Sequence, residues 1–99
     1  MRLISYTIKP GLTDENRNLI AGVFDALREG ELADLSYTVL ESADGRFLHV
    51  AQSTESSSKA LQSLPAFRTF VAALEDRQEA PLVISELKIV GTYGSLIGQ

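Results

Sequence analysis

The feature that most constrains this chain is the way its hydrophobic pattern changes period along the sequence. Some segments alternate between apolar and polar residues, as half-buried strands do. Others repeat apolar residues every three or four positions, as amphipathic helices do. The pattern predicts six segments in the order strand, helix, strand, strand, helix and strand. They span, in that order, residues 2–9, 13–30, 35–42, 46–53, 65–79 and 82–90.

This order predicts one ferredoxin-like α+β domain, βαββαβ, over residues 1–99. At 99 residues the chain has room for a single core. Two βα units with right-handed crossovers form a four-stranded antiparallel sheet and place both helices on one face of it. The opposite face keeps apolar side chains that the helices cannot cover. We therefore expect a homodimer in which a second copy packs on that sheet face.

The turn between the two central strands decides which side chains share a face. Asp44–Gly45 is a strong signal for a two-residue turn, because both positions tolerate a positive φ. That turn pairs Val39 with Val50 and Leu40 with His49. A three-residue turn with a bulge would shift the pairing by one residue and turn one strand over. We favour the first register because it matches valine with valine, and the direction in which His49 points stays open.

The connection after this hairpin is predicted to be partly irregular. Residues 54–58 are rich in serine and predict a polar loop, and residues 59–63 predict a short helical turn. Pro65 then suits the first turn of the second long helix, where a missing N–H costs no hydrogen bond.

Composition argues against several classes of function. The net charge is −4, whereas a surface that neutralises phosphates is basic, so neither nucleic acid nor an anionic membrane is an expected partner. RNA-recognition domains share the βαββαβ order, but they stack bases on aromatic residues of the central strands, and only Phe47 qualifies here. The chain has no cysteine, which removes disulfides, thiolate nucleophiles and cysteine-based metal sites. We expect no metal and no cofactor.

No segment of the sequence resembles a targeting or membrane-spanning element. Residues 1–10 carry Arg2 and Lys9 around a short alternating run, without the uninterrupted apolar core of a signal peptide. No stretch approaches the roughly 20 apolar residues of a membrane span. We therefore expect a cytoplasmic protein.

His49, the only histidine, is the candidate for chemistry, because imidazole titrates near neutral pH. It could act as a general base or contact a ligand in a pocket. The alternative is a neutral histidine that is hydrogen-bonded at the dimer face. A single histidine without cysteine is a poor basis for a transition-metal site.

Four aromatic residues are candidates for binding a substrate. The hydroxyls of Tyr6 and Tyr37 could orient a phenolic or quinone-like compound, although strand tyrosines more often pack in the core. Phe67 and Phe70 lie at helical spacing and could form either core or an apolar pocket wall. Glu86 interrupts an apolar strand, either as an edge charge that discourages aggregation or as a group that faces a cavity.

Three segments together resemble the antibiotic-biosynthesis-monooxygenase type of the dimeric α+β barrel superfamily. They are Ile4–Asp14 (ISYTIKPGLTD), Arg46–Val50 (RFLHV) and Ala60–Phe70 (ALQSLPAFRTF). The resemblance implies a dimer whose two sheets close into a barrel, with a pocket between sheet and helices in each subunit. For activity it implies a cofactor-independent oxygenase of aromatic compounds or a haem-degrading enzyme, since the family contains both.

The chain departs from that family where its functional residues lie. Members commonly use an Asn on the first strand, a Trp at the end of the third strand and, in haem degraders, a His on the second helix. Here the first strand has Ser5, Tyr6 and Thr7, the sequence has no Trp, and the histidine position falls near Leu64. The resemblance therefore carries over no catalytic residue.

Two functional hypotheses follow. The first is a small-molecule-binding dimeric barrel, such as a cofactor-independent monooxygenase or isomerase acting on an apolar aromatic compound. His49 would be its catalytic residue, and the four aromatic residues named above would bind the substrate. The second is a non-catalytic module whose sheet face serves self-association or binding to a partner protein. A cavity that opens to solvent favours the first hypothesis, and a filled core favours the second.

Overall fold

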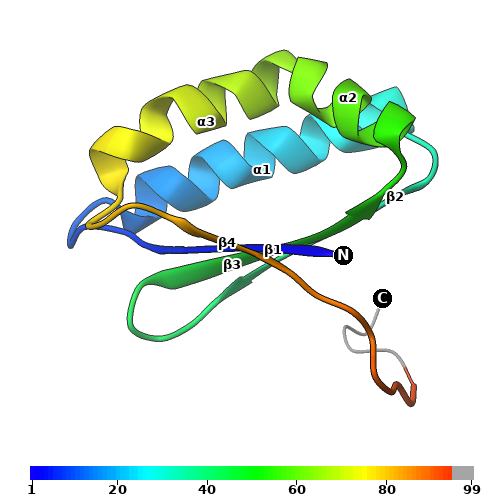
Figure 1. Ribbon diagram of the computed structural model, residues 1–99. Coiled ribbons are helices and arrows are strands. Elements are labelled where there is room, and N and C mark those ends of the chain that lie inside the picture. Colours follow the sequence, from blue (N-terminus) through cyan, green and yellow to red (C-terminus); the bar gives the residue numbers. More distant parts are fainter. Residues whose placement is uncertain (95–99) are drawn as a thin grey trace.

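In the computed structural model, which describes residues 1–94, four antiparallel strands form one layer and three helices form a second layer on one face of the sheet (Figure 1). The elements are β1 Arg2–Thr7, α1 Thr13–Gly30, β2 Leu35–Glu41, β3 Arg46–Ser53, α2 Glu55–Ser63, α3 Pro65–Arg77 and β4 Val83–Glu86. The predicted ferredoxin-like α+β fold is confirmed, with α2 as an additional helix before α3.

The strand order β2-β3-β1-β4 places β1 inside the sheet, between β3 and β4. Its alternation directs Ile4, Tyr6 and Ile8 toward the helices, where they join the core. We call this side of the sheet the covered face. The core consists of apolar side chains that are buried between the two layers. They are Tyr6, Ile8, Val23, Phe47, Leu61, Phe70 and Leu74.

The predicted two-residue turn of the central hairpin is wrong. Residues 42–45 join β2 to β3, and Ser42 N donates to the Arg46 carbonyl at 2.9 Å, so this closing pair encloses a turn of three residues, 43–45. Within the turn the backbone N–H of Gly45 donates to the carbonyl of Ser42 at 3.2 Å. Gly45 has a φ of 84°, but Asp44 is not among the residues with a positive φ. The predicted turn needs a positive φ at both positions, whereas a three-residue turn needs it only at the glycine.

The longer turn shifts the pairing of β2 and β3 by one residue. His49 pairs with Val39 instead of Leu40, and Val50 pairs with Thr38. Because side chains alternate between the two faces, this shift turns β2 over relative to the predicted register. Tyr37 therefore shares the covered face with His49. The register favoured from the sequence places these two residues on opposite faces.

Residues 54–58, predicted as a polar loop, belong mostly to α2. Thr54 is the residue before the first helical turn, and its side chain accepts a hydrogen bond from the Ser57 N–H at 3.0 Å. Ser57 Oγ accepts one from the Thr54 N–H at 2.9 Å in return. This reciprocal pairing satisfies two amides that a helix start leaves open. Serine replaces the usual Glu or Gln of that motif, which is why the sequence pattern did not reveal it.

The last strand is shorter than the predicted segment 82–90. β4 pairs only with β1, and the final rung joins Glu86 to Arg2. One further backbone hydrogen bond runs from Leu87 N to Met1 O at 2.7 Å. Since β1 begins there, it offers no partner to the following residues, and the chain leads away from the sheet (Figure 1). Apolar side chains in this segment are exposed, including Val90 at 92%.

The face of the sheet opposite the helices has no covering layer within the described residues (Figure 1). We call it the open face. The strand registers place apolar side chains on it, with small polar residues such as Ser5 and Thr38 between them. The apolar residues are Leu3, Leu40, Leu48, Val50 and Val83. The predicted apolar side chains on the face opposite the helices are therefore present; Val83 is 59% exposed, and the other four are half-buried.

Candidate ligand-binding site

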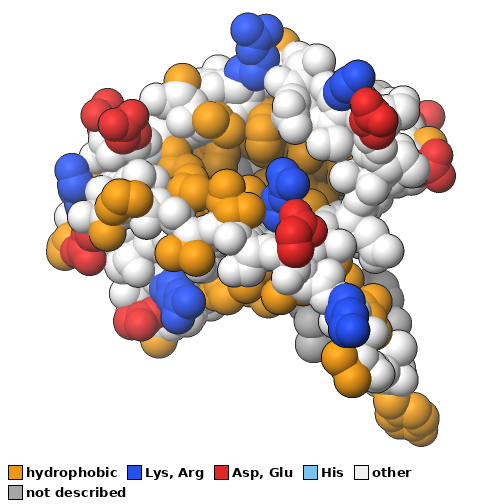
Figure 2. Space-filling model, viewed as in Figure 1, with side chains coloured by type: hydrophobic (Ala, Val, Ile, Leu, Met, Phe, Trp, Pro, Cys, Tyr) orange, Lys and Arg blue, Asp and Glu red, His pale blue; other side chains and the backbone are white. Residues whose placement is uncertain are grey.

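A cavity of about 700 Å³ lies between the sheet and the helices α2 and α3. Every strand contributes to its lining, and so do both of these helices. Figure 2 shows the cavity as a hollow lined largely by hydrophobic side chains, with a pair of opposite charges beside it. The core is therefore not filled at this end of the molecule.

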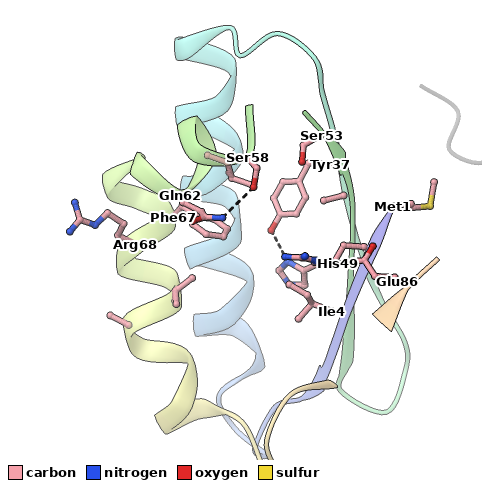
Figure 3. A pocket seen from close by; sticks show the side chains of 15 residues that line it. Met1, Ile4, Tyr37, His49, Ser53, Ser58, Gln62, Phe67, Arg68 and Glu86 are labelled. Carbon is pink, nitrogen blue, oxygen red and sulfur yellow. Dashed lines mark hydrogen bonds and ion pairs between the residues drawn. The ribbon is translucent and has the colours of Figure 1, made fainter. Parts of the chain in front are cut away.

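The sheet side of the cavity carries two polar groups that contact each other. Tyr37 from β2 and His49 from β3 are diagonal neighbours on the covered face, because Tyr37 pairs with Ala51 and His49 with Val39. The Tyr37 hydroxyl lies 2.7 Å from His49 Nδ1 (Figure 3). Burial raises the pKa of the Tyr37 phenol, so the hydroxyl keeps its proton at neutral pH.

The helical side of the cavity is mainly apolar. Leu61 from α2 and Phe67 and Val71 from α3 form most of this wall. Its one internal polar contact among the described residues joins Gln62 Nε2, as donor, to Ser58 Oγ at 3.2 Å (Figure 3). The helical side therefore combines these apolar side chains with the polar residues Ser58, Gln62 and Arg68, and the sheet side presents the buried pair of Tyr37 and His49.

Charged side chains lie at the rim of the cavity rather than inside it. Arg2 Nε donates to Glu86 Oε1 at 3.1 Å, and both side chains are more than half exposed. Arg68 points away from the cavity (Figure 3). Exposed ion pairs of this kind contribute little to stability. The sequence predicted that Glu86 is either a charge on an edge strand or a group that faces a cavity. Both descriptions hold, since Glu86 lies on the edge strand β4 and lines the cavity mouth.

His49 is held deep in the wall on the covered face and is 4% exposed. Its Nε2 lies 2.6 Å from the Tyr6 hydroxyl, and its ring stacks on Phe70 with centroids 5.4 Å apart. Burial lowers the pKa of His49 to about 4, so the imidazole is neutral at pH 7. The sequence offered a second interpretation, a neutral histidine that is hydrogen-bonded at the dimer face. Its placement on that face is wrong, because His49 lies under the helices.

Hydrogen bonds continue from His49 into the core. Tyr6 Oη accepts from Asn16 Nδ2 at 3.1 Å, and Asn16 Oδ1 accepts from Arg77 Nε at 3.0 Å. Asn16 is 0% and Arg77 2% exposed. Burial raises the pKa of Tyr6 to about 12 and lowers that of Arg77 from its ordinary value. We call these five side chains, from Tyr37 through His49, Tyr6 and Asn16 to Arg77, the polar chain.

The structure brings the five predicted site residues together but gives them different positions. Tyr37, His49 and Phe67 line the cavity. Tyr6 and Phe70 lie behind this wall, at 4% and 3% exposure, where Tyr6 holds His49 by a hydrogen bond and Phe70 holds it by ring contact. Tyr6 and Phe70 therefore support the site instead of facing it.

Asn16 and Arg77 were missed by the sequence reasoning, although a signal exists for both. Asn16 precedes Leu19, Ile20 and Val23 by three, four and seven residues, so it continues the apolar stripe of α1. Arg77 follows Phe70 and Leu74 at the same kind of spacing in α3. A polar residue at a stripe position is directed into the core and needs a partner there.

Two negative findings hold for residues 1–94. They contain no group of three or more His, Asp or Glu side chains placed to hold a metal ion. They also contain no helix that is long and apolar enough to cross a membrane.

Comparison with known proteins gives a result only at the level of structure. No family model and no curated protein matches the sequence. Among solved structures, Rv0793 from Mycobacterium tuberculosis matches with a TM-score of 0.73 at 14% identity, over 94% of this chain and 96% of that one. A protein from Bacteroides thetaiotaomicron, described as a candidate antibiotic biosynthesis monooxygenase, has a TM-score of 0.78 at 13% identity, over 97% and 93%.

A third match comes from Caulobacter crescentus and carries the same description, with a TM-score of 0.73 at 14% identity over 91% of this chain and 88% of that one. This chain shares the fold of these solved structures. The resemblance noted in three sequence segments is thereby confirmed as a likeness of fold that covers most of the chain. Identities this low establish the fold alone, and function has to be argued from the site.

Proposed function

We propose that this protein is a homodimer that binds a small apolar aromatic compound in the cavity between sheet and helices. The observation that carries the proposal is a cavity of about 700 Å³ that combines apolar side chains such as Leu61 and Phe67 with a hydroxyl–imidazole pair, Tyr37 and His49. Sites for small molecules typically combine such a volume with apolar and aromatic walls and a few convergent polar groups. Tyr37 and Phe67 are the proposed ligand contacts.

The reaction we propose is a cofactor-independent oxygenation or isomerisation of the bound compound. The description of the structural neighbours as antibiotic biosynthesis monooxygenases supports oxygenation. His49 would take part through Tyr37, because tyrosine hydroxyls already contact both of its ring nitrogens and its pKa is lowered to about 4. A general base works best with a pKa near the operating pH, so direct proton abstraction by His49 is disfavoured.

The cavity can be tested by filling it. Ala51 lines the cavity from β3, so Ala51→Phe should occupy the space and abolish the binding of naphthoquinone measured by isothermal titration calorimetry. Ala43→Phe, in the exposed turn before β3, is the matched control and should bind as the wild type does. Wild-type protein that binds neither naphthoquinone nor any other member of a panel of bicyclic aromatic compounds would contradict the proposal.

The dimer is proposed from the open face. Its apolar residues lie in one layer that no element of residues 1–94 covers, and burying them against a second copy would gain about 25 cal/mol for each Å² removed from water. Leu48→Lys places a charge in the middle of that face and should yield monomers in sedimentation at micromolar concentration. Thr69→Lys, on the exposed side of α3, should leave the association unchanged.

A non-catalytic module for self-association is the second candidate, and the open face supports it as well. The two candidates differ in their use of the cavity. The second candidate is favoured if the dimer binds none of the aromatic compounds and consumes no oxygen when they are added. The first is favoured if the wild-type dimer binds one of them and Ala51→Phe abolishes this binding.

A further inference from the structure

A continuous series of hydrogen bonds connects the cavity with a buried cation at the end of α3. The polar chain runs from Tyr37 to Arg77, with donor–acceptor distances of 2.7, 2.6, 3.1 and 3.0 Å in that order. The four members other than Tyr37 are at most 4% exposed, and the polar chain reaches the cavity at Tyr37 and His49. Each hydrogen bond has a direction, and these directions are linked because each of the three inner members, His49, Tyr6 and Asn16, contacts two neighbours.

The cation fixes the direction of the first hydrogen bond. A guanidinium has donors and no acceptor, so Arg77 must donate and Asn16 must present its oxygen. Arg77 is itself held in place, since its Nη2 donates to the Phe70 carbonyl at 3.2 Å and its cation lies 5.3 Å from the centre of the Phe70 ring. The amide nitrogen of Asn16 is therefore directed at Tyr6, where it can only donate.

Tyr6 passes this direction on to His49. Its oxygen accepts from Asn16, and its own proton needs an acceptor because a buried unpaired hydroxyl is costly. Among the described residues the remaining partner of this hydroxyl is His49 Nε2, at 2.6 Å. Tyr6 therefore donates to Nε2, and this ring nitrogen carries no proton. The reverse direction would leave the Tyr6 proton buried without an acceptor.

The histidine then sets the direction of the last hydrogen bond. His49 is neutral at pH 7, so its single ring proton lies on Nδ1, and Nδ1 donates to the Tyr37 oxygen at 2.7 Å. The Tyr37 proton cannot point back at the imidazole. Since Tyr37 lines the cavity, its proton is available to a group that enters the cavity.

We propose that the polar chain holds the Tyr37 hydroxyl as a hydrogen-bond donor into the cavity, and that the ligand is an aromatic ketone or quinone whose carbonyl oxygen accepts this bond. The second half of the inference rests on the proposed function, and the first half does not. Asn16 and Arg77 are positioning residues, because they touch no ligand and act through Tyr6 and His49. An aromatic amine, whose polar group mainly donates, fits this site poorly.

The direction of the polar chain can be measured without a ligand. The chain has one histidine, so protein labelled with ¹⁵N histidine gives a single pair of ring-nitrogen signals. Long-range correlation to the ring carbon-bound protons separates Nδ1 from Nε2, and the ¹⁵N shift shows which of them carries the proton. We expect the proton on Nδ1 at pH 7. A proton on Nε2 in the wild type would overturn the inference.

One substitution should reverse the whole polar chain. Asn16→Asp keeps an acceptor for Arg77 but replaces the amide donor by a second acceptor oxygen, so Tyr6 would donate to the new carboxylate. The Tyr6 oxygen would then accept from His49 Nε2, and Nδ1 would accept from Tyr37. We expect the ring proton to move from Nδ1 to Nε2. Asn18→Asp, which adds the same charge on the exposed side of α1, should leave the proton on Nδ1.

The ligand half is tested with a pair of probes that differ in their carbonyl groups. Naphthoquinone should bind the wild type more tightly than naphthalene, and Tyr37→Phe should weaken naphthoquinone on the order of tenfold while leaving naphthalene unchanged. Asn16→Asp should weaken naphthoquinone to a similar extent, since Tyr37 would then direct its proton at His49. If Asn16→Asp does not fold, the binding of the two probes to Tyr37→Phe still decides whether Tyr37 donates to the ligand.

The outcomes separate the two claims. Equal binding of both probes, unaffected by Tyr37→Phe, would overturn the donor role of Tyr37 and leave the cavity as a ligand site. Binding of neither probe, with the proton found on Nδ1, would overturn the proposed function and the ligand class but support the direction of the polar chain. Loss of naphthoquinone alone on Tyr37→Phe, with the proton moved by Asn16→Asp, would support the inference in full.

Discussion

Phe47 and Leu48 are neighbours in β3, yet they lie in very different surroundings. Phe47 points to the covered face, is 1% exposed and stacks on Tyr6 with ring centroids 5.7 Å apart. Leu48 points to the open face, where the described part of the chain supplies no covering layer. The alternation of β3 is the same for both residues, so the difference arises entirely from where the helices pack.

The comparison extends to the polar residues of the two faces. On the covered face the polar groups form the polar chain, in which each member is hydrogen-bonded to the next, while Arg77 Nη1 has no partner among the described residues. On the open face the polar residues are small, such as Ser5 and Thr38, and lie between apolar side chains. One face is therefore organised around a cavity by the chain itself, and the other is suited to a flat partner.

The largest predicted effect breaks the covered face. Phe47→Ala removes a fully buried ring and should lower the free energy of unfolding by about 3–5 kcal/mol. Urea denaturation followed by circular dichroism measures this loss. A loss below about 1 kcal/mol would mean that the space under the helices is not packed as described.

The next effect concerns pH and the same face. The pKa of His49 is about 4 in the folded protein and 6.5 in an exposed histidine, so the unfolded chain binds more protons between these values. Above pH 6.5 His49 is protonated in neither state, and its contribution to the free energy of unfolding has its full value. This contribution decreases as the pH falls from 6.5 toward 4 and changes no further below pH 4. Its full size is about 3 kcal/mol. The observable is the difference in urea midpoint between wild type and His49→Gln, which should shrink as the pH falls through this range.

The two tyrosines sharpen the comparison within the polar chain. Tyr6→Phe leaves the buried atoms Asn16 Nδ2 and His49 Nε2 without their hydrogen-bond partner and should cost about 1–3 kcal/mol. Tyr37→Phe removes one hydrogen bond at the cavity wall and should cost about 0.5–1.5 kcal/mol. Equal losses in urea denaturation would show that the buried and the cavity-facing hydroxyl are equivalent, which the polar chain does not allow.

The smallest predicted effect is on the open face. Leu48→Ala should change the stability of the isolated chain by about 1 kcal/mol or less, because the described residues bury this side chain only in part. Its effect should appear instead in the dimer dissociation constant. Denaturation at nanomolar concentration and sedimentation at micromolar concentration separate the two quantities.

The sequence predicts the order of elements because period-two and helical patterns are properties of short segments. It fails at the hairpin register, where Asp44–Gly45 fits two turns that differ by one residue. The packing of the helices on the sheet decides between the two turns, because only the observed register places Tyr37 beside His49 under α2 and α3. The end of β4 fails for a similar reason, since the sequence of 87–90 does not show that its partner strand ends at Arg2.

The sequence predicted the aromatic residues and the histidine of the candidate site, and it missed Asn16 and Arg77. His49, Tyr37 and Phe67 were found because their residue types are typical of ligand sites. Asn16 and Arg77 are 61 residues apart in the sequence and meet only when α1 packs against α3, so no local pattern links them. Each is a polar residue at a position of an apolar stripe. Only the folded chain shows that the two residues are hydrogen-bonded to each other.

We expect a ligand at the covered face of the sheet and not at the open face. Shift mapping of ¹⁵N-labelled protein titrated with naphthoquinone tests this claim directly, because both faces are observed in one experiment. We predict changes at cavity residues such as Ala51 and Phe67, and none at Leu40 or Val83 on the open face. Changes confined to the open face, with the cavity residues unaffected, would contradict the account.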